Sequence, residues 1–95
     1  MADYKAKPLL IRAEQISLLA QYDETGEAAR LRRELGIDDA ERIHAGREIF
    51  GWIQYTNPDA DNGKAQVSEW VLLWEDGLLS TMSDEHFKML FEPAH

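Results

Sequence analysis

Four stretches of the chain have the apolar and polar alternation of β-strands, or a concentration of β-branched and aromatic residues. They cover residues 7–16, 48–56, 65–74 and 78–82. The third stretch is apolar on both faces, which predicts either a strand covered on both sides or a strand with one face left to a partner. The periodicity leaves the structure of residues 17–24 open.

Helical spacing is clearest over residues 25–35, where Ala28, Leu31 and Leu35 fall on one apolar stripe. Gly36 follows directly, at the position where a glycine commonly ends a helix. The pattern therefore predicts a helix that packs through this stripe and stops at Gly36.

A second short helix is predicted between Asp38 and Gly46. Asp38 can cap its first turn, and Glu41 lies three residues later, as in a capping box. In this helix Ala40 and Ile43 would face inward.

The last predicted helix follows Ser83, a good N-cap residue. Acidic residues in its first turn favour the positive end of the helix dipole. Its buried stripe is predicted to be Phe87, Leu90 and Phe91, and Pro93 follows its end.

Turn-forming residues separate these elements. Residues 57–63 form a loop rich in Asn, Pro, Asp and Gly, and Asp76-Gly77 is a hairpin signal between residues 65–74 and 78–82. Together the elements predict one α+β domain spanning residues 1–95. We expect a small antiparallel sheet with a C-terminal hairpin and two or three short helices packed on it.

Composition narrows the function classes. The chain has no cysteine, which excludes disulfides and thiolate chemistry, and its longest apolar runs fall far short of the ~20 residues of a membrane span. The N-terminus has no signal-peptide core, so a cytoplasmic location is expected, without membrane contact.

The net charge of −8 is unevenly distributed. Residues 1–50 hold eight basic and ten acidic residues, whereas residues 51–95 hold two and eight. Since phosphate binding depends on Lys and Arg, direct nucleic-acid binding is disfavoured. An acidic face suits a basic protein partner, although acidity can also serve solubility alone.

No motif indicates catalysis. Residues 57–63 imitate the start of a calcium loop, but Asn62 stands at the sixth position and Ser68 at the twelfth, where glycine and glutamate are needed. The three histidines lack the spacing of a metal site, and neither a phosphate-binding glycine loop nor a nucleophile elbow is present. We expect no enzyme activity, no cofactor and no metal.

Two groups of side chains have both a structural and a functional interpretation. Among Trp52, Trp70 and Trp74, buried core residues are the simpler expectation, and an interface anchor at Trp74 is the alternative. The arginines of the first helix are interpreted as a solvated face with ion pairs rather than a basic patch: Arg30, Arg32 and Arg33. The residues predicted to bind a partner are Trp74, Glu75, Asp76, Asp59 and Asp61.

The two ends of the chain resemble a known family. The N-terminal segment has the form Tyr-x-x-Lys-Pro-hydrophobic-hydrophobic-Ile-x-Ala-x-Gln over residues 4–15. The C-terminal segment combines Glu69-Trp70, the turn at Gly77, and Phe87 with Phe91-Glu92. Both are similar to small phage and prophage proteins of the PGDYG-type family, named for a Pro-Gly-Asp-Tyr-Gly element. The resemblance implies a shared fold and a phage origin.

These observations predict a small acidic accessory protein of phage type that binds a host or phage protein and modulates it without catalysis. One alternative is a nucleic-acid-mimicking inhibitor of a host defence nuclease, which needs carboxylates spaced along one face. The other is a self-associating structural protein, for instance a homodimer.

Overall fold

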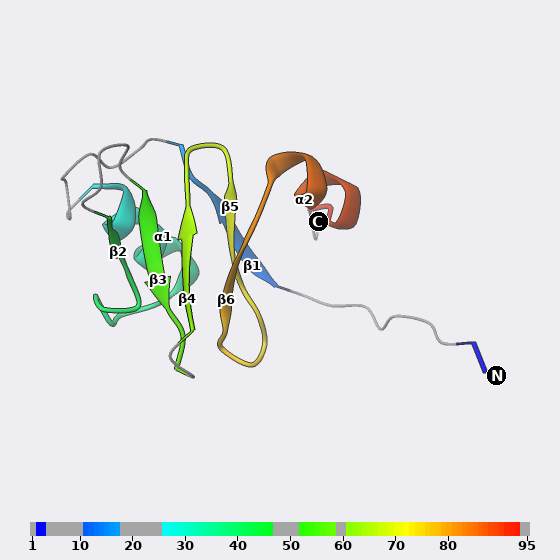
Figure 1. The fold of residues 1–95 in the computed structure, drawn as a ribbon, viewed down its shortest axis with the longest axis horizontal. Helices are drawn as coiled ribbons and strands as arrows, with labels where there is room; N and C mark the ends of the chain where they lie inside the picture. Colours follow the sequence, from blue (N-terminus) through cyan, green and yellow to red (C-terminus); the bar gives the residue numbers. More distant parts are fainter. Residues whose placement is uncertain (1, 4–10, 18–25, 47–51, 59–60, 94–95) are drawn as a thin grey trace.

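The structure is a computed structural model, and it describes residues 2–3, 11–17, 26–46, 52–58 and 61–93. Within these residues six strands and two helices follow one another along the chain (Figure 1). In chain order they are β1 (Arg12–Gln15), α1 (Glu27–Leu35), β2 (Ile43–Ala45), β3 (Ile53–Thr56), β4 (Asn62–Ala65), β5 (Trp70–Leu73), β6 (Leu79–Met82) and α2 (Asp84–Leu90).

The strands form two antiparallel sheets, with the orders β1-β5-β6 and β2-β3-β4. The α+β class is therefore confirmed, and the chain is mostly sheet, but one small sheet was expected where two are found. Strand β4 lies beside β6 (Figure 1), so the two sheets meet side by side. Helix α1 contacts β1 of one sheet and β2 of the other.

Helix α1 forms where the apolar stripe predicts it. Ala28, Leu31 and Leu35 are almost completely buried, and Gly36 takes the left-handed conformation with φ 75°. That conformation costs glycine little and lets its N–H bond to the carbonyl oxygens that the helix end leaves free. The helix begins at Glu27.

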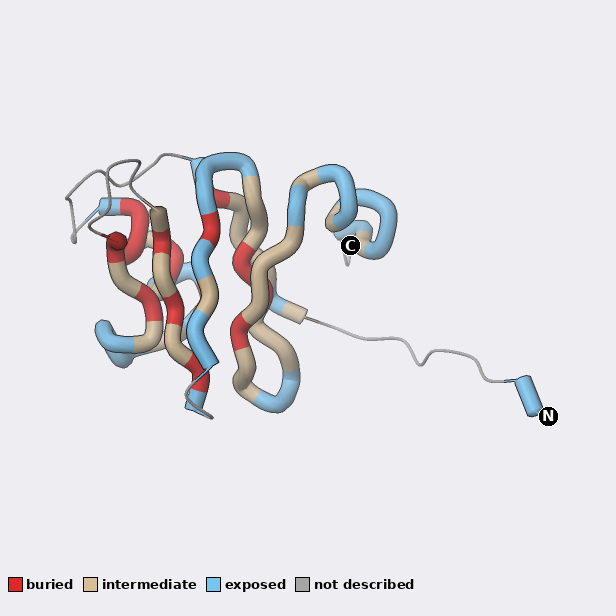
Figure 2. Tube along the Cα trace, viewed as in Figure 1, coloured by how far each residue is buried: buried red, intermediate tan, exposed pale blue. Residues whose placement is uncertain are grey.

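The hydrophobic core draws on both sheets and on α1, and Figure 2 shows its buried positions running through the strands and the helix. Alternate residues of the strands point inward, as the period of two requires. The buried cluster comprises Ile16, Ala28, Leu31, Leu35, Ile43, Ala45, Ile53, Tyr55, Ala65, Val71 and Leu79. One core thus joins all these elements.

The predicted helix over residues 38–46 is wrong. Asp39 accepts a hydrogen bond from the backbone N–H of Glu41 at 2.9 Å and closes a turn, after which the chain extends as β2. Pairing with β3 buries Ile43 and Ala45 in the core and leaves Ala40 exposed. Long-range strand pairing outweighs the local capping pattern here.

The predicted strand over residues 65–74 is divided in two. A turn at residues 66–69 separates β4 from β5, and Ser68 adopts a positive φ of 74°. Residues before the turn pair with β3, whereas residues after it pair with β1. The loop predicted over residues 57–63 ends two residues earlier than expected, because β4 already begins at Asn62.

The C-terminal part agrees with the sequence only partly. Strands β5 and β6 pair across the turn at residues 74–78, but the chain then continues into α2, so it has no C-terminal hairpin as such. Ser83 caps α2 by accepting a bond from the N–H of His86. Phe87 and Phe91 are half-buried, but Leu90 is 58% exposed and was wrongly predicted to be buried.

Side-chain hydrogen bonds connect the two sheets. The buried Asn57 side chain donates to the carbonyl oxygen of Leu79 at 2.9 Å and accepts from its N–H at 2.6 Å. Further along, the Thr81 hydroxyl lies 3.0 Å from both the Tyr55 hydroxyl and the Lys64 carbonyl oxygen. Asn57 therefore replaces one rung of a backbone ladder between the end of β3 and the start of β6.

We predict that Asn57→Ala lowers the free energy of unfolding by about 1–3 kcal/mol, because it leaves the buried N–H and C=O of Leu79 without partners. Urea denaturation measures this change. Asn62→Ala, at an exposed position, is the matched control and should stay within about 0.5 kcal/mol of the wild type. Equal effects of the two substitutions would contradict the role given to Asn57.

Candidate partner-binding surface

Three connections lie together at one end of the sheets, the lower end in Figure 1: the α1–β2 loop, the β3–β4 loop and the β5–β6 turn. Strand register places them there, since β2, β3 and β4 pair in sequence and β5 returns into β6. Their exposed acidic residues form what we call the acidic end, namely Asp38, Asp39, Glu41, Asp61, Glu75 and Asp76.

Hydrogen bonds to backbone atoms fasten the three loops to one another. The Arg42 guanidinium donates to the carbonyl oxygens of Thr56 at 3.0 Å and Gly77 at 2.7 Å, so it links the α1–β2 loop to the end of β3 and to the β5–β6 turn. Asn57 bonds to Leu79, and its own N–H donates to the Asp61 carbonyl oxygen at 2.7 Å. The loops that carry the carboxylates of the acidic end are therefore joined to one another, or to neighbouring strand ends, by hydrogen bonds.

The β5–β6 turn is stabilised locally. Gly77 has φ 85°, a conformation that side-chain-bearing residues rarely adopt. The Asp76 carboxylate accepts a hydrogen bond from the N–H of Leu78 at 3.0 Å while remaining exposed. Glu75 and Asp76 are thus presented outward by a turn of defined shape.

Three of the five residues predicted to bind a partner lie in the loops of the acidic end, namely Asp61, Glu75 and Asp76. Asp59 lies outside the described residues. Trp74 is adjacent in sequence, but its indole N–H donates to the Ser80 hydroxyl at 2.7 Å, and its ring meets Phe91 edge-on at 6.2 Å.

Sequence reasoning did not include three further acids of this end, Asp38, Asp39 and Glu41. The mistaken helix over residues 38–46 placed them in a capping pattern instead of a loop. A signal in the sequence was the concentration of three acids within residues 38–41, shortly before the apolar Ile43, which is completely buried in the structure.

Trp74 belongs to an aromatic cluster between β5 and α2. Trp70 stacks on Phe87 with a centroid distance of 3.9 Å, and Phe87 stacks on Phe91 at 5.1 Å. Both tryptophans share a face of the strand with the fully buried Leu72. The aromatic cluster is thus the cover of that face, as expected for a strand buried on both sides.

Asp84 connects this cluster to β1. Its carboxylate accepts hydrogen bonds from the Trp70 indole at 2.9 Å and the Gln15 amide at 3.1 Å, and Lys88 lies 3.0 Å away. The Trp70 hydrogen bond, and after it the Lys88 ammonium, holds the pKa of Asp84 below its ordinary value. The charged form of this side chain is therefore favoured in the folded protein.

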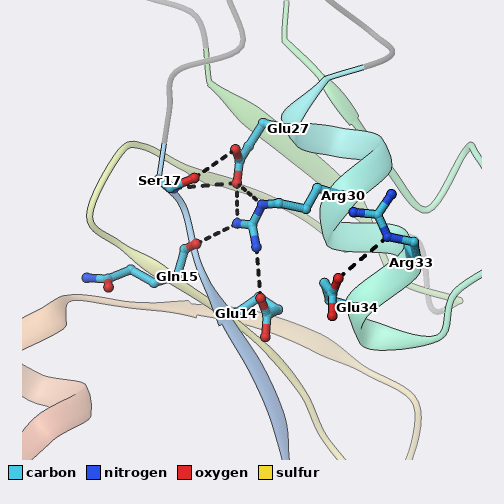
Figure 3. Close-up of polar contacts among 7 residues, drawn as sticks. All are labelled: Glu14, Gln15, Ser17, Glu27, Arg30, Arg33 and Glu34. Carbon is cyan, nitrogen blue, oxygen red and sulfur yellow. Dashed lines mark hydrogen bonds and ion pairs between the residues drawn. The ribbon is translucent and has the colours of Figure 1, made fainter.

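The arginines of α1 are more than a solvated face. Arg30 donates to Glu27, to Glu14 at 2.8 Å and to the Gln15 carbonyl oxygen at 2.7 Å, while the Ser17 hydroxyl donates to Glu27 at 3.1 Å (Figure 3). The Glu27 side chain is only 4% exposed, and its hydrogen bond to Arg30 is the main cause that raises the pKa of Arg30.

The two neighbouring arginines differ from each other. Arg32 donates to the carbonyl oxygen of Ile43 in β2, so it fastens α1 to the other sheet. Arg33 is 70% exposed and lies 3.5 Å from Glu34, as the interpretation of a solvated face predicted. The expected ion pairing is therefore found, but two of the three side chains hold the helix to strands.

In the part of the chain that the structure describes, no three His, Cys, Asp or Glu side chains come together as a metal site would need. Neither of the helices described there has the length and apolar character required to cross a bilayer.

The chain was compared with protein-family models, curated proteins and solved structures, and none of them matches it. The resemblance of its two ends to the phage and prophage family therefore stays a prediction.

We predict that Asp84→Asn weakens the protein most near neutral pH. A lowered pKa means that the carboxylate's stabilising contribution is present above the ordinary carboxyl pKa and is lost as pH falls through the lower, folded-state value. The difference between wild type and variant, measured by urea unfolding from neutral pH down to about pH 3, should shrink with acidification. Glu85→Gln, in the same helical turn, is the control, and a gap that does not depend on pH would contradict the assignment.

Proposed function

We propose that this chain is a non-catalytic binding module that docks on a protein with a basic surface through its acidic end and modulates that protein. The observation that carries the proposal is the gathering of six exposed carboxylates on three neighbouring loops. If the resemblance of its two ends to the phage and prophage family holds, the chain is a phage-type accessory protein that acts on a host or phage protein in the cytoplasm.

The described loops of the acidic end carry more acidic than basic side chains. Arg42 is the basic side chain found among the described loops, and its guanidinium donates to the carbonyl oxygens of Thr56 and Gly77. Like charges that gather on one surface add their fields, which steer a basic partner and set its orientation. Such steering is screened over roughly 8 Å at physiological salt.

The hydrogen bonds that hold these loops in place also favour binding. Loops already held by Arg42 and Asn57 lose little conformational freedom when a partner docks, so less of the interaction free energy is spent on ordering them. The same hydrogen bonds keep carboxylates from different loops in a constant arrangement, which supports selectivity for one pattern of basic residues.

The alternative of a nucleic-acid mimic has less support. Several carboxylates away from the acidic end are paired with cations, as Glu14 and Glu27 are with Arg30 and Asp84 is with Lys88. A phosphate-like row would need such acids to remain unpaired along a face. We therefore favour docking on a protein surface.

Capture of partners from bacterial lysate at moderate salt, with immobilised chain, tests the proposal. The variant Asp61→Asn, Glu75→Gln and Asp76→Asn removes three charges of the acidic end and keeps the Asp76 oxygen that accepts from Leu78. We expect a specific partner of the wild type to be lost or weakened at least tenfold, since several charge contacts of ~1 kcal/mol or less act together.

The matched control removes three exposed charges elsewhere, through Asp3→Asn, Glu34→Gln and Glu85→Gln. It should retain the partner. Equal loss in both variants would show a response to net charge alone, and full retention by the acidic-end variant would refute docking at this surface.

A further inference from the structure

The outward face of the sheet β2-β3-β4 carries a row of polar side chains. His44, Gln54 and Lys64 stand directly opposite one another across the three strands, and Thr56 and Asn62 form the next pair. Residues between them point inward, among them the buried Ile53, Tyr55 and Ala65. The five polar side chains therefore share one face.

These five side chains line a hollow of about 200 Å³. Pockets for drug-sized ligands measure about 300–1,000 Å³, so this one suits a smaller compound. Of the five side chains, His44 has its Nδ1 3.4 Å from the Ala45 carbonyl oxygen. Among the described residues, neither the amides of Gln54 and Asn62 nor the Thr56 hydroxyl has a hydrogen-bond partner.

The charge at this hollow is opposite to that of the molecule. None of the described acidic residues lines it, whereas Lys64 does. Lys64 is held 4.0 Å from the ring centroid of Trp52, a cation–π contact that fixes its position without neutralising its charge. The lining residues Lys64, Gln54, Asn62 and Thr56 thus carry an ammonium, two amide groups and a hydroxyl, all able to donate hydrogen bonds.

We propose that this hollow is a binding site for a small oxyanion-bearing molecule, with Lys64 contacting the anionic oxygens and Gln54 and Asn62 fixing their orientation. A carboxylate and a phosphate ester present the same charged oxygens, so the shared chemistry defines the ligand class. The hollow adjoins the acidic end, since Asn62 follows Asp61 directly, but its lining side chains are different ones. The proposal stands whether or not the acidic end docks on a protein.

Titration of the isotope-labelled protein with inorganic phosphate and, separately, with acetate tests the proposal by nuclear magnetic resonance. The side-chain amide signals of Gln54 and Asn62 report directly on the site, and sodium chloride at matched ionic strength corrects for salt. We expect saturable shifts confined to residues around the hollow. If only one of the two anions saturates the site, that anion shows whether the ligand carries a phosphate or a carboxylate. If neither anion saturates the site, the proposal is overturned.

Lys64→Met keeps the aliphatic stem over Trp52 and removes the charge. It should therefore raise the dissociation constant of the saturating anion at least tenfold. Arg33→Met removes one charge from the exposed face of α1 and is the matched control, with an expected change below twofold. Similar weakening in both variants, or none in Lys64→Met, would refute the assigned role of Lys64.

Discussion

The structure depends on joining two small antiparallel sheets whose described strands share no backbone ladder. A three-stranded sheet has two edges with unpaired backbone groups, and each group that is buried without a partner costs about 1–3 kcal/mol. At the meeting of β4 and β6, side chains supply the missing bonds: Asn57 pairs with both backbone groups of Leu79, and Thr81 reaches the Lys64 carbonyl. The junction is therefore built from a few specific side chains.

Helix α1 contacts the other edge strand of each sheet, β1 and β2. Its apolar stripe enters the common core, and its arginines bond to carbonyl oxygens of the strands on either side, Arg30 to Gln15 in β1 and Arg32 to Ile43 in β2. Burying Glu27 is tolerated because Arg30 pairs with it and Ser17 donates to it. Both the core and the strand edges thus rely on one nine-residue helix.

Local signals in the sequence were sufficient for part of this fold. The stripe of α1 with Gly36, the turn at Gly77 and the cap at Ser83 depend on neighbouring residues, and all three are found. The division of residues 65–74 and the strand at Ile43 depend on distant pairing partners, which periodicity does not contain. For the same reason, sequence pointed to Glu75 and Asp76 but not to the acids that another loop brings beside them.

We infer that side-chain bonds make the two sheets a single cooperative unit, which holds the acidic end in one arrangement. Native-state hydrogen exchange measures this directly, residue by residue. We predict that the amides of Tyr55 in one sheet and Val71 in the other exchange with the same opening free energy, equal to that of global unfolding. Opening of one sheet at a clearly lower free energy than the other would contradict it.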